Sequence, residues 1–292
     1  LFDLAAGMKA DPAAWSESLK GRSLAMVFQK PSTRTRVSFE VGMFQLGGQA
    51  HFLGANDIQL HRGETVGDTA AVLSRYVDGI MARVFAHQDV LDLARHGTVP
   101  VINGLSDLLH PCQALADYFT LRERRGQVSG LKMAYIGDGN NVCHALMFGA
   151  VKLGCPMSVG CPGGHEPNKL IVKSAAREAQ KLGSPAPEVT NDPMAAVAGA
   201  DVVYTDVWAS MGQEAEHKQR LEIFQGYKVT PEMMAAANPE AVFMHCLPAL
   251  RGEEVDAAVI DGPQSVVFDE AETRLHVQKA VLVTLMGGVS PG

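Results

Sequence analysis

The sequence lacks several features that would assign it to a specialised class of protein. Its five cysteines are an odd number with no Cys-x-x-Cys spacing, which disfavours a disulfide framework and a zinc cluster. No run approaches the ~20 apolar residues of a membrane span, and residues 1–20 lack the pattern of a secretion signal. The net charge of −7 disfavours broad affinity for nucleic acid or for anionic membranes. We therefore expect a cytoplasmic protein with reduced thiols and small-molecule ligands.

The composition, 47% hydrophobic and 20% charged, is typical of a folded globular chain. Short apolar runs alternate with segments of helical periodicity, a pattern that predicts a parallel α/β fold. The predicted strands lie near 23–28, 49–53, 78–83, 99–102, 131–136, 157–161, 187–190, 201–205, 241–244 and 266–268. The predicted helices lie near 35–46, 65–76, 87–96, 111–125, 141–153, 167–182, 192–199 and 270–286.

The pattern restarts after Gly126 and Gly130, which predicts two domains, residues 1–125 and 126–269. Each is expected to hold a mostly parallel sheet flanked by helices. The last helix, within about 270–292, has no strand after it and is expected to pack back on the first domain. Ligands of open parallel sheets bind beyond the carboxyl ends of the strands, so we expect an active site in the cleft between the domains.

A polar turn between an apolar run and an amphipathic run predicts an anion site near residue 32. The turn directs hydroxyls, backbone N–H groups and the positive end of a helix dipole at one point, with Arg34 and Arg36 beside it. A phosphate fits that description. The alternative is a capped helix with solvated arginines, because Ser and Thr are common N-caps.

Other candidate site residues gather at the predicted carboxyl ends of strands. In the first half they are Gln59, Arg83, His110 and Gln113, and in the second half Asn140, Asn141, Asp206, Ser210, Met211, His245 and Cys246. Each has an ordinary structural alternative as a cap, a turn residue or a buried side chain. Asp206 is also suited to bind a substrate ammonium, and the small residues that follow it are typical of a loop that closes over a ligand.

The segment Gly137-Asp138-Gly139-Asn140-Asn141-Val142 invites a dinucleotide-binding interpretation, which we disfavour. Val142 stands where that motif has its third glycine, and no acidic residue ends the next predicted strand, where the ribose would need one. The amide side chains of Asn140 and Asn141 can instead donate and accept hydrogen bonds to a zwitterionic ligand.

Taken together, four motifs resemble the transcarbamylase family over about residues 20–286. They are Ser32-Thr33-Arg34-Thr35-Arg36, His110-Pro111-Cys112-Gln113, Asp206-Val207-Trp208-Ala209-Ser210-Met211-Gly212-Gln213 and His245-Cys246-Leu247-Pro248. The first two resemble the family's shared carbamoyl-phosphate site, and the last two resemble its ornithine carbamoyltransferase branch. The resemblance implies that carbamoyl phosphate and L-ornithine react to L-citrulline and phosphate. It implies no metal or organic cofactor, and a homotrimer or a multiple of trimers.

By that resemblance, the phosphate is held by Ser32, Thr33, Arg34 and Thr35. Arg83, His110 and Thr35 polarise the carbonyl, while Gln113 and the backbone of Cys246 and Leu247 fix the carbamoyl amide. Gln59 resembles a residue that reaches the site of a neighbouring subunit, and Arg274 matches the arginine before the family's final helix. Asn141, Asp206, Ser210 and Met211 resemble the ornithine-binding set. Cys246 is expected to position groups rather than to attack, with the amine attacking the carbonyl directly.

Three alternatives stay open at the level of sequence. The nearest is a carbamoyltransferase for putrescine, lysine or an acylated ornithine, although an acylated amine would offer Asp206 no ammonium. A catalytically silent ligand sensor on the same fold is a second, and a nucleotide-dependent dehydrogenase is the third.

Overall fold

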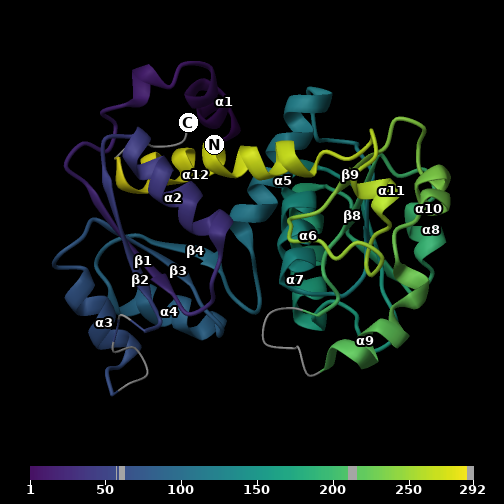
Figure 1. The fold of residues 1–292 in the computed structure, drawn as a ribbon, viewed down its shortest axis with the longest axis horizontal. Helices are drawn as coiled ribbons and strands as arrows, with labels where there is room; N and C mark the ends of the chain where they lie inside the picture. Colours follow the sequence, from purple (N-terminus) through teal and green to yellow (C-terminus); the bar gives the residue numbers. More distant parts are fainter. Residues whose placement is uncertain (57, 59–62, 210–215, 288–292) are drawn as a thin grey trace. The chain divides into compact units, whose positions relative to one another are not determined.

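The computed structural model describes residues 1–56, 58, 63–209 and 216–287. The chain forms two compact units, which Figure 1 shows in sequence colours. Unit 1 comprises Leu1–Ala116 together with Glu272–Gly292, and unit 2 comprises Asp117–Ala271. Each unit contains one parallel sheet with helices packed on it, which confirms the predicted fold class. The division between the two compact units lies inside α5, at residues 116 and 117, and the predicted domain boundary at residues 125 and 126 lies at the end of the same helix.

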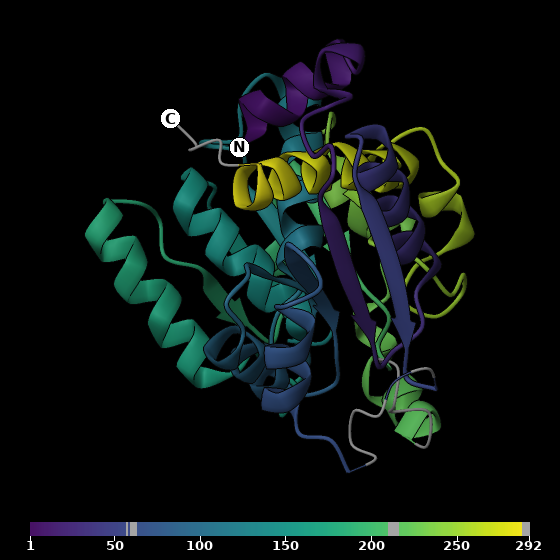
Figure 2. The same ribbon diagram turned by 90° about the vertical axis from the view of Figure 1, so that its left-hand side faces the viewer.

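Unit 1 is built on a four-stranded parallel sheet of order β2-β1-β3-β4. Figure 2 shows β1 and β2 side by side. The strands are β1 Ser23–Phe28, β2 Gln49–Gly54, β3 Gly79–Arg83 and β4 Val101–Leu105. The helices are α1 Phe2–Ala10, η1 Ala13–Trp15, α2 Thr33–Gln45, α3 Val66–Leu73 and α4 His87–His96, with the start of α5 Pro111–Arg125 and most of α12 Val267–Met286.

Helices cover both faces of this sheet. On one face, strand residues such as Val27 and Ile80 form a buried cluster with Ala70 of α3 and Leu93 of α4. On the other face lies α12, whose Met286 approaches Gly79, and α12 packs beside α2 because Gly42 leaves room for the Lys279 side chain (Figure 1). The last helix therefore belongs to the layer that also contains the predicted anion turn.

Unit 2 is built on a five-stranded parallel sheet of order β7-β6-β5-β8-β9. The strands are β5 Met133–Ile136, β6 Met157–Gly160, β7 Glu188–Thr190, β8 Val202–Thr205 and β9 Val242–Met244. The helices are α6 Asn141–Leu153, α7 Lys169–Leu182, α8 Pro193–Val197, α9 His217–Ile223, η3 Gln225–Tyr227, α10 Pro231–Ala236 and α11 Ala257–Ile260, with the rest of α5 and the start of α12.

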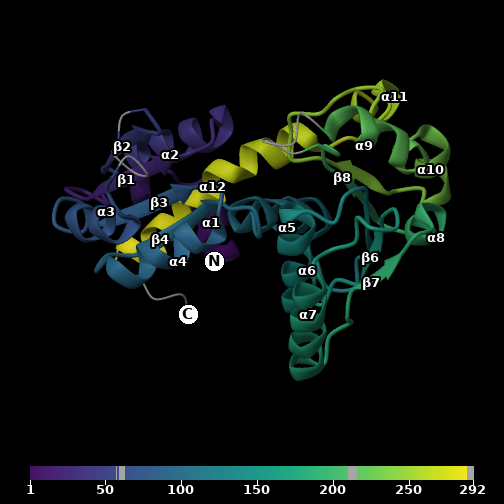
Figure 3. The same ribbon diagram turned by 90° about the horizontal axis from the view of Figure 1, so that it is seen from below.

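Alternate strand residues of this sheet face different helices. Ile136, Val203 and Phe243 pack with α8, α10 and α11, whereas Tyr135 and Tyr204 stack on each other on the opposite face. Figure 3 shows α6 and α7 on one side of the sheet and α8 and α10 on the other. This layering is the usual consequence of right-handed crossovers between parallel strands.

The predicted strand at 266–268 is wrong, because α12 begins at Val267. Only Ser265 forms an isolated bridge to Phe243, and Phe268 is 73% exposed. The apolar run is too short to outweigh Asp269, whose charge in the first turn favours the positive end of a helix. The short helices α9, α10 and α11 and the N-terminal α1 were not predicted, since a few residues carry little periodicity.

None of the helices in the described part of the chain is long and apolar enough to cross a membrane.

Close packing of α6 on α5 leads to a stability prediction. A Cβ at Gly149 would lie 2.2 Å from the ring of Tyr118, which is buried and donates a 2.7 Å hydrogen bond to the Leu146 carbonyl. We expect Gly149→Ala to lower the free energy of unfolding by about 1–3 kcal/mol, because the overpacking outweighs the better helix propensity of alanine.

The matched control is Gly7→Ala in α1, where an added Cβ meets no atom within 4 Å. That change is expected to raise the free energy of unfolding by about 0.5–1 kcal/mol. Urea unfolding followed by Trp208 fluorescence for unit 2 and Trp15 fluorescence for unit 1 measures both. Equal effects of the two substitutions would contradict the packing argument.

Candidate active site

In both units, polar residues follow the strands at the point where the strand order reverses. In unit 1, β1 lies between β2 and β3; the loop after β1 carries Ser32, and Arg83 is the last residue of β3. In unit 2, β5 lies between β6 and β8, and the loops after β5 and β8 carry Asn140 and Asp206. Such switch points are the places where open parallel sheets bind ligands, because the crossovers leave a crevice there. The loops carry the residue types that the sequence singled out.

The turn after β1 opens the N-terminus of α2. Ser32 is its N-cap, and its hydroxyl accepts a 3.2 Å hydrogen bond from the Thr35 N–H. Thr33 and Arg34 form the first helical turn, where backbone N–H groups and the helix dipole favour a bound anion. The predicted anion turn and the cap therefore coincide, and the two interpretations of the sequence do not exclude each other.

Arg274 of α12 connects the predicted residues of unit 1. Its guanidinium donates to the Gln113 side-chain oxygen at 2.5 Å and to the Thr35 hydroxyl at 3.2 Å. All three side chains are almost completely buried. Arg274 lies inside α12, whereas the family resemblance implied a position before the final helix. The planar guanidinium of Arg274 thus connects Thr35 of α2 to Gln113 of α5, two helices that are far apart in the sequence.

The electrostatics of this region favour an anion. His110, which precedes α5, has a pKa well below its ordinary value of 6.5, first because of burial and then because of the charges of Arg274, Arg83 and Arg34. These three guanidinium groups thus lie close enough to one imidazole to disfavour its protonation. His110 is neutral at neutral pH, and its Nδ1 is buried without a hydrogen-bond partner among the described residues.

We define the unit 1 cluster as the residues that these contacts and charges bring together: Ser32, Thr33, Arg34, Thr35, Arg83, His110, Gln113 and Arg274. Arg36 does not belong to it, although the sequence put it beside the anion turn. Its guanidinium lies 3.8 Å from the centre of the Phe52 ring and donates to Glu40. Gln59 lies outside the described residues.

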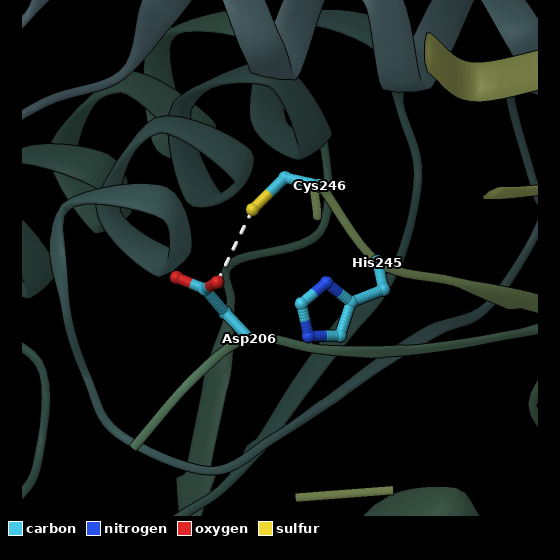
Figure 4. A group of neighbouring side chains, drawn as sticks. All are labelled: Asp206, His245 and Cys246. Atoms are coloured by element: carbon cyan, nitrogen blue, oxygen red, sulfur yellow. Dashed lines mark hydrogen bonds between the residues drawn. The ribbon is translucent and has the colours of Figure 1, made fainter. Parts of the chain in front are cut away.

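In unit 2 the predicted residues meet at the ends of β8 and β9. The Cys246 thiol donates to Asp206 Oδ1 at 3.1 Å, and the Asn140 amide donates to Asp206 Oδ2 at 2.8 Å. Figure 4 shows the Cys246 sulfur pointing toward the Asp206 carboxylate. Asn140 also caps α6, because its side-chain oxygen accepts the N–H groups of Val142 and Cys143. We call Asn140, Asn141, Asp206, Cys246 and Leu247 the unit 2 cluster.

The Cys246 side chain is a protonated thiol at neutral pH. Its pKa lies well above the ordinary value of 9.0, first because of burial and then because of the neighbouring carboxylates of Asp206 and Glu270. A thiol in such surroundings is a hydrogen-bond donor and a poor nucleophile, since the thiolate is the reactive form.

Asp206, His245 and Cys246 each place one potential metal ligand within 4.8 Å of the others. The imidazole of His245 is nevertheless already engaged at both nitrogens. Nδ1 accepts the Leu247 N–H at 2.9 Å, and Nε2 lies 3.1 Å from Glu254 Oε1. A metal would have to displace one of these buried hydrogen bonds, so this group is not a preformed metal site.

The sequence identified some neighbours of Asp206 and missed others. Asn141, one of the predicted ligands, is the first residue of α6, while its neighbour Asn140 makes the contact with Asp206. Ser210 and Met211 lie outside the described residues.

Arg220 was missed, because a charged residue in a polar helical segment is ordinarily solvated. Here it is buried, donates to the Trp208 carbonyl at 2.8 Å and pairs with Asp138 and Glu216.

Comparison with known proteins places both halves of the chain in one family. Residues 1–123 match the aspartate/ornithine carbamoyltransferase carbamoyl-P binding domain, and residues 129–285 match the Asp/Orn binding domain of the same enzymes. Together the matches span most of the chain.

Individual relatives agree with this result. The ornithine carbamoyltransferase of Thermococcus kodakarensis is 60% identical over 271 residues, which cover 93% of this chain and 86% of the relative. The solved ornithine carbamoyltransferase of Pyrococcus furiosus is 56% identical, with a TM-score of 0.95 over 99% of this chain and 93% of that one. A solved N-acetyl-L-ornithine transcarbamylase is 34% identical, with a TM-score of 0.86 over 97% of this chain and 94% of that one.

The neutral state of His110 predicts a pH dependence of stability. Below pH 6.5 the unfolded chain protonates this imidazole and the folded protein does not, so stability is lost as the pH falls. Between pH 7.5 and 5.5 we expect the wild type to lose about 1.4 kcal/mol more free energy of unfolding than His110→Gln. Urea unfolding in phosphate-free buffer, followed by Trp15 in a Trp208→Phe background, measures the difference. Parallel pH profiles of the two proteins would contradict the assignment.

Proposed function

The chain belongs to the aspartate/ornithine carbamoyltransferase family and functions as an ornithine carbamoyltransferase, and we propose how its residues carry that reaction. Family membership confirms the resemblance found in the sequence. The enzyme transfers the carbamoyl group of carbamoyl phosphate to the δ-amine of L-ornithine, giving L-citrulline and phosphate. The observation that carries this conclusion is the identity of about 60% to ornithine carbamoyltransferases over most of the chain.

We propose that the first domain, through the unit 1 cluster, binds carbamoyl phosphate. Ser32, Thr33, Arg34 and Thr35 hold the phosphate at the N-terminus of α2, where N–H groups and the helix dipole complement its charge. Arg83 and the neutral His110 donate hydrogen bonds to the carbonyl oxygen as it gains negative charge in the transition state. Arg274 orients Gln113 for the carbamoyl amide through the 2.5 Å hydrogen bond between them.

The second domain is proposed to bind L-ornithine. Asp206 accepts the α-ammonium, supported by the two donors, Asn140 and Cys246, that fix the orientation of its carboxylate. Asn141, Ser210 and Met211 complete the ornithine-binding set by resemblance to the family. The backbone of Cys246 and Leu247 contacts the carbamoyl amide. Transfer requires the carbamoyl carbon and the δ-amine to meet, and much of the rate then comes from their orientation.

The reaction step is a direct attack of the neutral δ-amine on the carbamoyl carbon. The C–N bond forms, the C–O bond to phosphate breaks, and the amine loses a proton for which the departing phosphate is an acceptor. A lysine-like amine has a pKa of about 10.4 in water, so the site must favour the neutral form by removing the amine from solvent. We propose that no metal or organic cofactor takes part, because phosphate is already a good leaving group.

We further propose that the enzyme acts in the cytoplasm and assembles as a homotrimer or a multiple of trimers, with Gln59 serving a neighbouring subunit. These assignments rest on the family resemblance.

A product assay tests the acceptor. The purified protein is incubated with carbamoyl phosphate and, separately, ornithine, putrescine, lysine, N-acetylornithine or aspartate. We expect carbamoylation of ornithine to exceed that of N-acetylornithine by at least about 100-fold, because the acetyl group removes the ammonium that pairs with Asp206. Faster turnover of any other acceptor would replace ornithine, and no turnover of all five would favour a ligand sensor.

Cys246→Ser tests direct attack. Serine can still donate to Asp206, so we expect kcat to fall by less than about 100-fold, whereas loss of a true nucleophile costs about a millionfold. Intact-mass measurement after incubation with carbamoyl phosphate alone should reveal no carbamoyl adduct on Cys246. A trapped adduct together with an inactive serine variant would require a covalent mechanism.

A further inference from the structure

The chain that leaves β9 is held by side chains rather than by the sheet. The His245 N–H donates to Glu270 Oε2 at 3.0 Å, the Leu247 N–H to His245 Nδ1 at 2.9 Å, and the Leu250 N–H to Glu254 Oε1 at 2.6 Å. The three accepting side chains, Glu270, His245 and Glu254, are completely buried. Backbone N–H groups that leave water need acceptors, and after Met244 these three N–H groups find them in side chains. Three polar side chains therefore accept hydrogen bonds from this one segment.

These hydrogen bonds determine the tautomer of His245. Because Nδ1 accepts the Leu247 N–H, it carries no proton, and the neutral imidazole carries its proton on Nε2. That N–H donates to Glu254 Oε1 at 3.1 Å. Glu254 Oε1 therefore receives two donors, the imidazole and the Leu250 N–H. A chain of two hydrogen bonds thus connects the Glu254 side chain, through the His245 imidazole, to the backbone N–H of Leu247.

Leu247 needs such support because its backbone is in an unfavourable region. Its φ is +57°, and among the described residues other than glycine it is the one with a positive φ. A left-handed conformation costs an L-residue with a side chain free energy and persists where the surroundings enforce it. The hydrogen bond to Nδ1 reaches the N–H of this very residue.

We propose that His245 and Glu254 form a positioning pair that holds the backbone of Cys246 and Leu247 in the conformation that binds the carbamoyl group. Neither side chain touches substrate in this proposal. It rests on the proposed function, because that function gives the Leu247 backbone its ligand. The proposal gives a positioning role to His245, the first residue of the His245–Pro248 motif, and to Glu254, which lies outside that motif.

Two substitutions of His245 separate its two hydrogen bonds. The amide of His245→Asn lies near the position of Nδ1 and can accept the Leu247 N–H, but it does not reach Glu254. The amide of His245→Gln lies near the position of Nε2 and can donate to Glu254, but it leaves Leu247 without its acceptor. Both remove the imidazole, so a merely structural role predicts similar losses in the two variants.

We expect kcat of His245→Gln to be at least about tenfold below that of His245→Asn, because displacement of a positioning group by about 1 Å can cost 100-fold. Calorimetric titration should show that inorganic phosphate binds both variants as it binds the wild type, since its proposed ligands lie in unit 1. Carbamoyl phosphate should lose about tenfold in affinity in His245→Gln relative to His245→Asn.

Glu254 is tested by a conservative and a truncating change. Glu254→Gln keeps an oxygen that can accept both N–H groups and is expected to retain kcat within about threefold, whereas Glu254→Ala should lose at least about tenfold. The matched control is Glu253→Ala, which removes the adjacent carboxylate, half-buried and paired at 2.9 Å with His217. This control should leave kcat and both affinities unchanged.

Equal kcat in His245→Gln and His245→Asn, or a loss in Glu254→Gln as large as in Glu254→Ala, would overturn the proposal. If either His245 variant fails to fold by circular dichroism, the Glu254 pair decides the question alone. Absence of citrulline formation by the wild type would instead refute the proposed function, and the two failures are thereby distinguished.

Discussion

Both clusters depend on one constraint, the common direction of all strands within each sheet. Because the strands of a parallel sheet run the same way, the loops after them leave at the same edge, and polar residues distant in sequence are brought together. In unit 1 this brings the turn after β1 near Arg83 and His110, and in unit 2 it brings Asn140 near Asp206 and Cys246. Helices on both faces of each sheet then bury these groups enough to change their protonation.

The two clusters have opposite electrostatic character. In unit 1, burial first and then three guanidinium groups lower the pKa of His110 and keep its imidazole neutral, so it can donate a hydrogen bond without adding a charge. In unit 2, carboxylates and burial keep the Cys246 thiol protonated, so the sulfur donates to Asp206. An anionic ligand group is complementary to the first field, and an ammonium group is complementary to the second. Acid–base state is thus set by neighbours, not by the residue types alone.

Helices with clear periodicity and strands with compact apolar runs were predictable, whereas the short helices α9, α10 and α11 were not. The helices at 87–96, 111–125 and 141–153 match α4, α5 and α6, because helices of 10, 15 and 13 residues are long enough to show a helical pattern in the sequence. The run at 266–268 was misassigned because three apolar residues fit a strand as well as a helix, and the charge of Asp269 in the next position favours the helix. At the site, Asn140 could not be separated from Asn141, since only the N-cap geometry of α6 turns one toward Asp206 and makes the other helical.

The sequence by itself determined the two-domain parallel α/β fold, the family and the order of the four motifs, because periodicity and motif chemistry are local properties of the chain. The tertiary structure decided which of those residues contact one another. In the structure Arg36 packs on the Phe52 ring, and Arg274 donates hydrogen bonds to Thr35 and Gln113. Glu254 is buried and accepts the Leu250 N–H. These pairings depend on packing between elements far apart in the chain, for which no local pattern of residues carries a signal.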